Sequence, residues 1–369
     1  MDDDISLITD QTATLYSLLL HINTIFNTLS TAFLIFLILK YSPESMSVYK
    51  WYLLNMTIWC YALDFFNTVL YVPYTIFPAV GTCNLGLLGS LTGFLPRVLA
   101  NSVSWAMFNQ LLGMCGVSIM ASSVYRLAAL HNATDAMTSP KTIFITVLAH
   151  IFYTAPCIAV YVTTFHSDEE QLEYIKNTHP KLLPFWNTHT CSIFISLSHL
   201  MRYALVAIAQ IVLAAAATLT IVWYCFREMK RTKDVISSKT YRLHKMLTIS
   251  LLLQFMIPML LLILPFIAFG IFSVTQLKHA QMVSIVTFVI STTHTTVNAI
   301  IMIGMIQPYR KVFFKYFWPI RRMIEATSTA PNSIKVSNQP KSYSFVSSTA
   351  VRSQSVRSQV RSQSVVGNM

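Results

Sequence analysis

The chain has 369 residues, of which 54% are hydrophobic, and a formal net charge of +12 at pH 7. Most of the hydrophobic residues stand in seven long, continuous stretches, which excludes a membrane β-barrel because barrel strands alternate apolar and polar residues. The basic residues fall between these stretches, so the positive charge indicates orientation in a membrane rather than a surface that binds nucleic acid.

Each stretch has about the 20 apolar residues that a helix needs to cross the roughly 30 Å hydrocarbon core of a bilayer. Because a helix satisfies its own backbone hydrogen bonds in lipid, we predict an all-α membrane protein, a bundle of seven transmembrane helices. The predicted helices, numbered 1 to 7 in chain order, are Leu15–Leu39, Trp51–Val72, Val98–Ser122, Thr142–Thr164, Tyr203–Phe226, Met246–Phe272 and Met282–Ile306.

The distribution of basic residues predicts that the N-terminus lies outside and the C-terminus inside. In this orientation 21 of the 26 Lys and Arg residues fall in inner segments, seven of them between Arg227 and Lys245, as the positive-inside rule requires. The predicted domains are an extracellular N-terminus (1–14), a seven-transmembrane domain (15–309), a short amphipathic helix (310–319) and a disordered, Ser- and Arg-rich cytoplasmic tail (320–369).

The amphipathic helix after helix 7 would place its aromatic residues against the acyl chains and its basic residues among the headgroups. The tail beyond it repeats Arg-Ser-Gln three times and has few apolar residues, which is typical of disorder. Ser355 and Ser364 follow arginines and are candidate phosphorylation sites, because a phosphate would reverse the local charge. The alternative is a low-complexity tail without regulation.

The longest outer loop, Phe165–Arg202, carries four acidic residues and is either a functional cover of the bundle or a solvated acidic hairpin. Cys83 and Cys191 are the two of the six cysteines that fall in outer segments, where an oxidising compartment permits a disulfide between them. Sequence alone does not give the distance between these residues. No group of Cys and His has the local spacing typical of zinc sites, so we expect neither a metal nor another cofactor.

Three polar side chains are predicted at similar depths inside the membrane. At a rise of 1.5 Å per residue, Asp64 on helix 2, His294 on helix 7 and Asn109 on helix 3 stand about 21, 24 and 25 Å from the inner edge. Ionisable groups inside a membrane often mark functional sites, so this layer is a candidate ligand site or conformational switch. The alternative is a polar network that only holds helices 2, 3 and 7 together.

Helix 6 contains Pro258 and Pro265, each of which removes a backbone donor and interrupts a helix. We predict that these prolines form a hinge, and that helix 6 is the one clearly broken helix. Trp105 and Phe108 on helix 3 and Phe255 on helix 6 are candidates for a ligand pocket, with core packing as the alternative.

Short motifs resemble those of G-protein-coupled receptors. At the inner end of helix 3, Val-Tyr-Arg-Leu resembles the receptor arginine motif, with Tyr125 in place of the acidic residue before Arg126. Helix 7 has Asn298 but no Asn-Pro-x-x-Tyr, and Pro308-Tyr309-Arg310 follows it. These departures distinguish the chain from the rhodopsin-like receptors.

The chain is more similar to the nematode serpentine chemoreceptors, in particular classes H and I of the Str superfamily. The likeness spans about residues 10–318, and the order and spacing of several segments carry it. These are Tyr49–Asn55 with Trp59 and Asp64, Tyr71–Pro73, Gln254–Pro258 and Pro308–Arg310. The resemblance implies a chemosensory receptor in the plasma membrane of a sensory cilium, which binds an external small molecule and activates a heterotrimeric G protein through movement of helix 6.

In that interpretation the G protein would contact the inner ends of helices 3, 5 and 6, at Tyr125, Arg126, Lys230, Arg231 and Lys245. A transporter or ligand-gated channel is the alternative, although the sequence shows no internal repeat of the kind that many transporters have. An intramembrane zinc hydrolase would need several histidines at one depth, usually spaced His-x-x-x-His, and the sequence has none with this spacing. We therefore expect no enzymatic activity.

Overall fold

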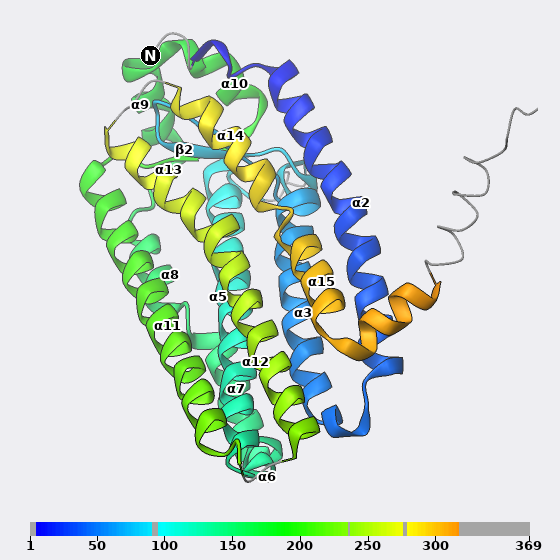
Figure 1. Cartoon of the computed structure of the whole chain (residues 1–369). Helices are drawn as coiled ribbons and strands as arrows, with labels where there is room; N and C mark the ends of the chain where they lie inside the picture. Colours follow the sequence, from blue (N-terminus) through cyan, green and yellow to red (C-terminus); the bar gives the residue numbers. More distant parts are fainter. Residues whose placement is uncertain (1–4, 91–94, 235–236, 276–278, 317–369) are drawn as a thin grey trace, which may run out of the picture. The chain divides into compact units, whose positions relative to one another are not determined.

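The computed structural model describes residues 5–90, 95–234, 237–275 and 279–316, all within one compact unit, Met1–Ile320. Seven spans in this part are long and apolar enough to cross a membrane, and each overlaps one predicted stretch, so the seven-helix bundle is confirmed (Figure 1). The spans are α2 (Asp10–Tyr41), α3 (Tyr49–Phe65) with the π-helical turn η2 (Phe66–Leu70), α5 (Arg97–Leu130), α7 (Pro140–Phe152) with α8 (Ala155–Val162), α11 (Leu197–Arg231), α12 (Ser238–Pro258) with the π-helical segment η5 (Met259–Ile263), and α14 (Ala280–Ser291) with α15 (His294–Met305).

The spans expose apolar side chains and bury polar ones, the reverse of a water-soluble protein. Leu205 and Leu213 on α11 are each 70% exposed, whereas Asp64 and His294 are fully buried. In a bilayer, the exposed apolar faces lie against lipid, and polar side chains form hydrogen bonds between helices.

The helix α5 lies at the centre of the bundle, where it contacts α3, α7, α8, α11 and α12 (Figure 1). It also contacts two strands at one end of the bundle, described below. Residues on α5 can therefore take part in sites at every depth of the bundle.

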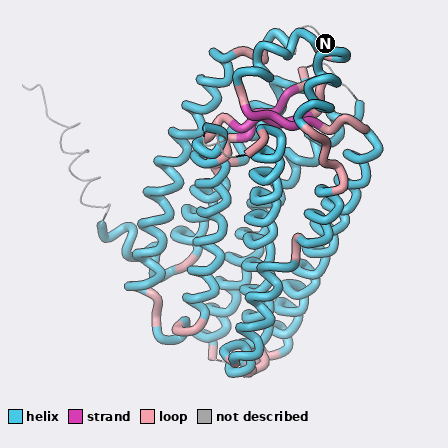
Figure 2. Tube along the Cα trace, turned by 180° about the vertical axis from the view of Figure 1, so that it is seen from behind, coloured by secondary structure: helices cyan, strands magenta, loops and turns pink. Residues whose placement is uncertain are grey.

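A three-stranded antiparallel sheet covers one end of the bundle, which we call the sheet end (Figure 2). Cys83 and Cys191 face each other across two of its strands and form a disulfide. We did not predict these strands, because each has only four residues and turns containing Pro and Gly lie beside them. In sheet order they are β1 (Pro73–Ile76), β2 (Gly81–Asn84) and β3 (Thr190–Ile193), and the short helix α4 (Leu87–Ser90) follows β2.

The long loop before α11 folds into a structured cover over the sheet. Its buried side chains Ile175 and Trp186 belong to the same apolar cluster as residues of the strands. One acidic residue, Asp168, accepts hydrogen bonds from the backbone N–H groups of Arg97 and Val98 at 3.0 and 3.1 Å, which fastens the cover to the N-terminus of α5. The elements of the cover are α9 (Asp168–Thr178), η4 (Pro180–Leu182) and α10 (Leu183–Thr188).

The opposite end of the bundle, which we call the loop end, carries η1 (Glu44–Met46) and α6 (Thr134–Thr138). Residues 307–316 form a helix after α15, three residues earlier than the predicted start at 310 (Figure 1). This helix lies against α2, with the ring centroids of Phe33 and Phe313 6.2 Å apart. The predicted tail, with Ser355 and Ser364, lies outside the described residues.

The first two spans differ from their predicted bounds at the sheet end. α2 begins at Asp10 rather than at Leu15, because the side chain of Thr9 accepts a hydrogen bond from the backbone of Thr12 and caps the helix. The second span ends at Leu70, two residues before its predicted end, and leads directly into β1.

Four spans depart from a continuous α-helix in the described part, whereas we predicted a break only in helix 6. Helix 2 changes to the π-helical η2 after Phe65. Helix 6 changes to the π-helical η5 after Pro258 and continues as α13 (Leu264–Thr275), with Pro265 in the first turn of α13. Helix 4 breaks between α7 and α8, where Pro156 stands in the first turn of α8. Helix 7 breaks at Thr292 and Thr293, where no proline or glycine marks the position.

Candidate functional site

A cavity of about 300 Å³ lies beneath the sheet, between α5, α8 and the strands β2 and β3. Aromatic side chains form much of its wall, and among the described residues that line it none is charged. Its polar groups are hydroxyls and one amide, from Ser102, Ser192 and Gln171 among others. Next to it, burial raises the pKa of Tyr71, so that the phenol beside the lining residue Thr82 stays neutral.

A second, smaller cavity of about 90 Å³ lies deeper in the bundle, between α5, α11 and α12. Asn109 and Cys115 line it from α5, and Phe255 and Pro258 line it from helix 6. The helix-6 proline with the π-helical segment after it therefore borders an internal space.

The three predicted pocket aromatics do not share one wall. Trp105 lines the cavity beneath the sheet, which we call the upper cavity, and Phe255 lines the smaller one, which we call the lower cavity. Phe108 packs against Trp105, with ring centroids 5.2 Å apart. A hydrogen-bond chain connects the two cavities, because Trp105 Nε1 donates to the Tyr203 hydroxyl at 2.9 Å, which donates to Asn109 Oδ1 at 2.8 Å.

Asp64 and His294 meet in the middle of the bundle, at similar depths as predicted. His294 Nδ1 lies 2.8 Å from Asp64 Oδ1, and both side chains are fully buried. The other carboxylate oxygen, Oδ2, accepts hydrogen bonds from Asn27 Nδ2 and from the backbone N–H of Thr295, each at 3.2 Å. The carboxylate thus stands at the N-terminus of α15, where the helix dipole favours a negative charge.

A side chain from helix 1 bridges the break in helix 7. In an unbroken helix the N–H of Thr296 would donate to the carbonyl of Thr292. Here the amide of Asn27 lies between them: its Nδ2 donates to the Thr292 carbonyl at 2.7 Å, and its Oδ1 accepts from the Thr296 N–H at 3.2 Å. We call Asn27, Asp64, His294 and the broken turn Thr292–Thr296 the polar hub.

Asn109 does not join this hub, although we predicted that it shares the layer. Its amide is engaged by Tyr203 and by the backbone of Trp105, on the side of α5 that faces α11. Counting residues from a helix end gives neither the tilt of the helix nor the face that a side chain takes, and both depend on how the helix packs. The residue of α5 that approaches His294 is instead Cys115.

Arg126 is buried at the loop end, although a group that contacts a partner was expected to be accessible. Its side chain is 4% exposed, and its Cζ atom lies 3.7 Å from the centroid of the Tyr49 ring. The Tyr125 ring packs against Tyr49 and Tyr52, with centroids 5.5 and 4.8 Å apart. Arg126 Nε and Nη2 have no hydrogen-bond partner among the described residues.

The other predicted partner-binding residues are exposed at the same end. Lys230 and Arg231 stand in the last turn of α11, and Lys245 stands on α12. Arg231 Nη1 lies 3.9 Å from Glu228 Oε1, a long ion pair that contributes little to stability because the Arg231 side chain is exposed. Since α11 and α12 both contact α5, exposed basic residues occur on the two helices that flank Arg126.

The comparison with known families agrees with this arrangement. A family model described as "Serpentine type 7TM GPCR chemoreceptor Srh" matches residues 11–319, which include all seven spans. The chain belongs to this family. The predicted resemblance to nematode serpentine chemoreceptors is thereby confirmed, and this Srh receptor is a multi-pass membrane protein. None of the curated proteins compared with it matches the chain.

Several residues that hold the sites of this Srh receptor were not predicted from the sequence. Asn27 could have been found as an amide within a predicted membrane helix, but the same helix also carries His21 and Asn23, and the sequence does not show which of the three is buried. Tyr203 and Tyr49 carry no signal in the sequence, because tyrosines are frequent in membrane helices. Cys60 and Cys115 stand in two different helices far apart in the sequence, and only the packing of α3 on α5 brings their sulfur atoms together.

Proposed function

We propose that this Srh receptor binds a small uncharged molecule in the cavity beneath the sheet and activates a heterotrimeric G protein at the loop end. The observation that carries the proposal is the cavity of about 300 Å³, which lies under a disulfide-linked sheet at the end of the bundle opposite Arg126. Its volume stands at the small end of the range for ligand sites in proteins.

The lining of the cavity supports an apolar or weakly polar ligand. Trp105, Tyr161 and Phe194 offer aromatic surface, while Ser102 and Gln171 offer a few hydrogen-bonding groups that would fix orientation. A charged ligand would lose its hydration there without gaining a counter-charge from the described lining. Volatile or metabolite-sized neutral molecules therefore fit this site best.

A connected set of side chains supports transmission to helix 6. A ligand that displaced Trp105 would disturb the bonded chain through Tyr203 to Asn109, which lines the lower cavity together with Phe255 and Pro258. Ligand binding shifts helix 6 only if the ligand binds one arrangement of these groups more tightly than the other. The π-helical segment after Pro258 is the place where helix 6 would bend.

The loop end supports recognition of a protein partner by Arg126. Two of its donor nitrogens are buried with no hydrogen-bond partner in the described part of the chain, and the guanidinium lies against the Tyr49 ring. An outward movement of helix 6 would expose these donors to a carbonyl or carboxylate of the G protein, beside the basic residues Lys230 and Lys245. The disulfide at the sheet end supports an orientation with this end in an oxidising exterior and Arg126 inside. The plasma membrane of a sensory cilium is the location that we propose from the family.

The experiment is expression with a promiscuous G protein and a calcium readout, screened with panels of neutral odorants and metabolites. For a molecule that activates the receptor, we expect Ala106→Phe to abolish the response at matched surface expression, because Ala106 lines the cavity. The Val212→Phe variant is the control and should respond normally, because Val212 is 58% exposed on the lipid-facing side of α11.

The same cells test coupling. Arg126→Ala should remove the ligand response while surface expression and ligand binding remain. A full response from Arg126→Ala, or from Ala106→Phe, contradicts the proposed function. A ligand-evoked current in cells that lack G proteins supports the transporter or channel alternative instead.

A further inference from the structure

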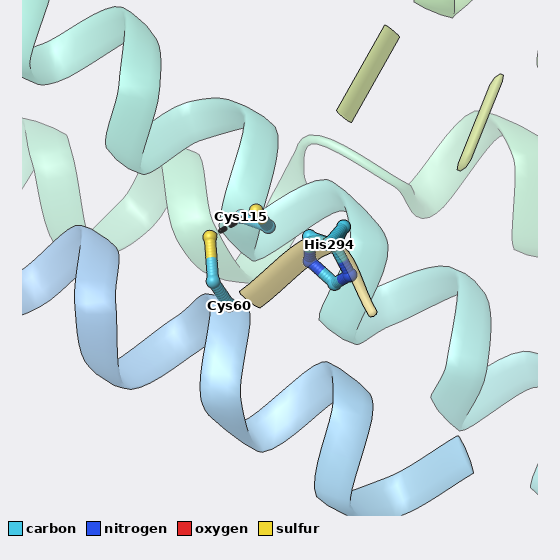
Figure 3. Close-up of side chains that lie close together, drawn as sticks. All are labelled: Cys60, Cys115 and His294. Carbon is cyan, nitrogen blue, oxygen red and sulfur yellow. Dashed lines mark hydrogen bonds between the residues drawn. The ribbon is translucent and has the colours of Figure 1, made fainter. Parts of the chain in front are cut away.

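Two cysteines and one histidine from three helices meet in the middle of the bundle. The Sγ atoms of Cys60 on α3 and Cys115 on α5 lie 2.8 Å apart. A ring nitrogen of His294, the first residue of α15, joins them so that the three atoms lie within 4.8 Å of one another. The three side chains are 1%, 2% and 0% exposed, and Figure 3 shows the two thiols pointing toward each other with the imidazole beside them.

We propose that Cys60, Cys115 and His294 bind a Zn²⁺ ion inside the membrane. Sulfur and imidazole nitrogen are the donors that Zn²⁺ takes most often in proteins. With bonds of about 2.3 Å to each sulfur, a tetrahedral ion holds its two sulfurs about 3.8 Å apart, so the thiols need to separate by only about 1 Å. Each thiol gives up its proton to solvent as the ion binds.

Asp64 contacts the ring nitrogen of His294 that would not bind the ion. Its Oδ1 lies 2.8 Å from His294 Nδ1, which leaves Nε2 as the nitrogen for the ion. Histidines that bind metals almost always contact a carboxylate or carbonyl through the other ring nitrogen, which fixes the ring and raises its basicity. Asp64 is itself held by Asn27 and by the Thr295 backbone, so this second layer is already in place.

The donor set and its charge select the ion. Hard ions such as Mg²⁺ and Ca²⁺ take oxygen donors, whereas two thiolates and an imidazole suit Zn²⁺ or Cu⁺. The two thiolates carry two negative charges, of which Zn²⁺ neutralises both and Cu⁺ only one. Because uncompensated charge is costly in a buried site, the divalent ion is favoured.

The surroundings leave room for a fourth ligand. Cys115 also lines the lower cavity of about 90 Å³, which is large enough for water molecules. Three protein ligands and one water are the arrangement of zinc sites that keep an open position. The ion would tie α3, α5 and α15 together beside the break in helix 7, independently of the proposed ligand and G protein.

The test uses the full-length receptor in lipid nanodiscs, with an epitope tag that contains no histidine. After chelation and addition of Zn²⁺, we expect about one bound ion per receptor, measured by mass spectrometry of the metal after desalting. Cys60→Ser/Cys115→Ser should bind less than about a tenth of this amount. The matched control is Cys157→Ser/Cys225→Ser, which removes two other buried free thiols and should bind as the unmodified receptor does.

Two further measurements keep the proposal testable if the double variant folds poorly. Co²⁺ added to the unmodified receptor should give thiolate-to-metal charge-transfer absorption, and Asp64→Asn should weaken Zn²⁺ affinity about 10- to 100-fold without changing the stoichiometry. Equal Zn²⁺ in the Cys60→Ser/Cys115→Ser variant, or no thiolate band with Co²⁺, overturns the proposal. Alkylation of the denatured, unreduced chain at two cysteines instead of the four free ones shows a second disulfide and also overturns it. None of these readouts depends on signalling.

Discussion

Asn27 on α2 serves Thr296 on α15 in place of a helix carbonyl, accepting from its backbone N–H at 3.2 Å and from its hydroxyl at 2.6 Å. The same amide donates to the Thr292 carbonyl and to Asp64, so one side chain serves both sides of the break in helix 7. A broken helix is tolerated inside a membrane only where the freed backbone groups find such partners. Side chains of helices 1 and 2 therefore stabilise the break.

Asn27→Leu should destabilise the receptor because it leaves the Thr292 carbonyl and the Thr296 N–H unpaired in a buried site. An unsatisfied buried group costs about 1–3 kcal/mol, so we expect the free energy of unfolding to fall by a few kcal/mol and the melting temperature by several degrees. Tryptophan fluorescence during heating measures this. Asn177→Leu, on the exposed face of α9, is the matched control and should leave the melting temperature unchanged; an equal loss in both variants contradicts the role of Asn27.

The sequence predicted the parts of the fold that are determined by the surrounding lipid. Lipid requires each span to be apolar over its whole length, so the seven helices and the depths of Asp64 and His294 follow from counting residues. The break at Thr292 was not predictable in this way, because its partners come from helices far away in the chain. Asn109 shows the same limit, because the residue of α5 that meets His294 is Cys115, further along the same helix.

The sheet end and the thiol pair escaped prediction for a related reason. Strands of four residues carry too short a pattern to be distinguished from a loop, and the cover formed by α9 and α10 stabilises them from outside. Rules for metal sites look for cysteines and histidines close together in the sequence. Cys60, Cys115 and His294 come from three helices and meet only after the bundle has formed.

Tyr49→Leu should raise signalling in the absence of ligand, because the Tyr49 ring holds the Arg126 guanidinium at 3.7 Å in this structure. A cation–π contact of about 0.5–2 kcal/mol corresponds to a roughly 2- to 30-fold change in the population with Arg126 released. Basal calcium signal at matched surface expression is the readout. Tyr49→Phe keeps the ring and should behave as the unmodified receptor; basal signalling that does not change in Tyr49→Leu counts against the restraint.

The Cys83–Cys191 disulfide should contribute strongly to stability because it closes a long segment of chain, its two cysteines standing 108 positions apart in sequence. Loss of a bridge across a loop of this size costs up to about 5 kcal/mol. Cys83→Ser/Cys191→Ser should melt several degrees lower and lose sensitivity to reductant, whereas Cys157→Ser/Cys225→Ser should keep both properties. A reductant that leaves the melting temperature of the unmodified receptor unchanged would show that the bridge is not stabilising.

His179, at the end of α9, should make the cover less stable in acid. Partial burial lowers the pKa of His179 below its usual 6.5, so the folded receptor binds a proton less readily than the unfolded chain. The stabilisation is fully present above pH 6.5 and is lost as the pH falls below it. Compared with His179→Gln, the unmodified receptor should therefore lose melting temperature between about pH 7.5 and pH 5. Parallel curves for the two proteins over this range would contradict the effect.

Pro258→Ala should stiffen helix 6 and weaken the ligand response. Alanine restores the backbone N–H that Pro258 lacks, and this N–H can donate to the carbonyl of Gln254. The π-helical segment after Pro258 should then change to a regular α-helix. We expect a higher melting temperature and a smaller maximal calcium response at equal ligand binding. Pro140→Ala is the control, since Pro140 stands at the first position of α7, after the capping residue Ser139, where a proline costs little and its removal should change neither quantity much. A full response from Pro258→Ala, with the higher melting temperature, would show that helix 6 does not bend at this proline during activation.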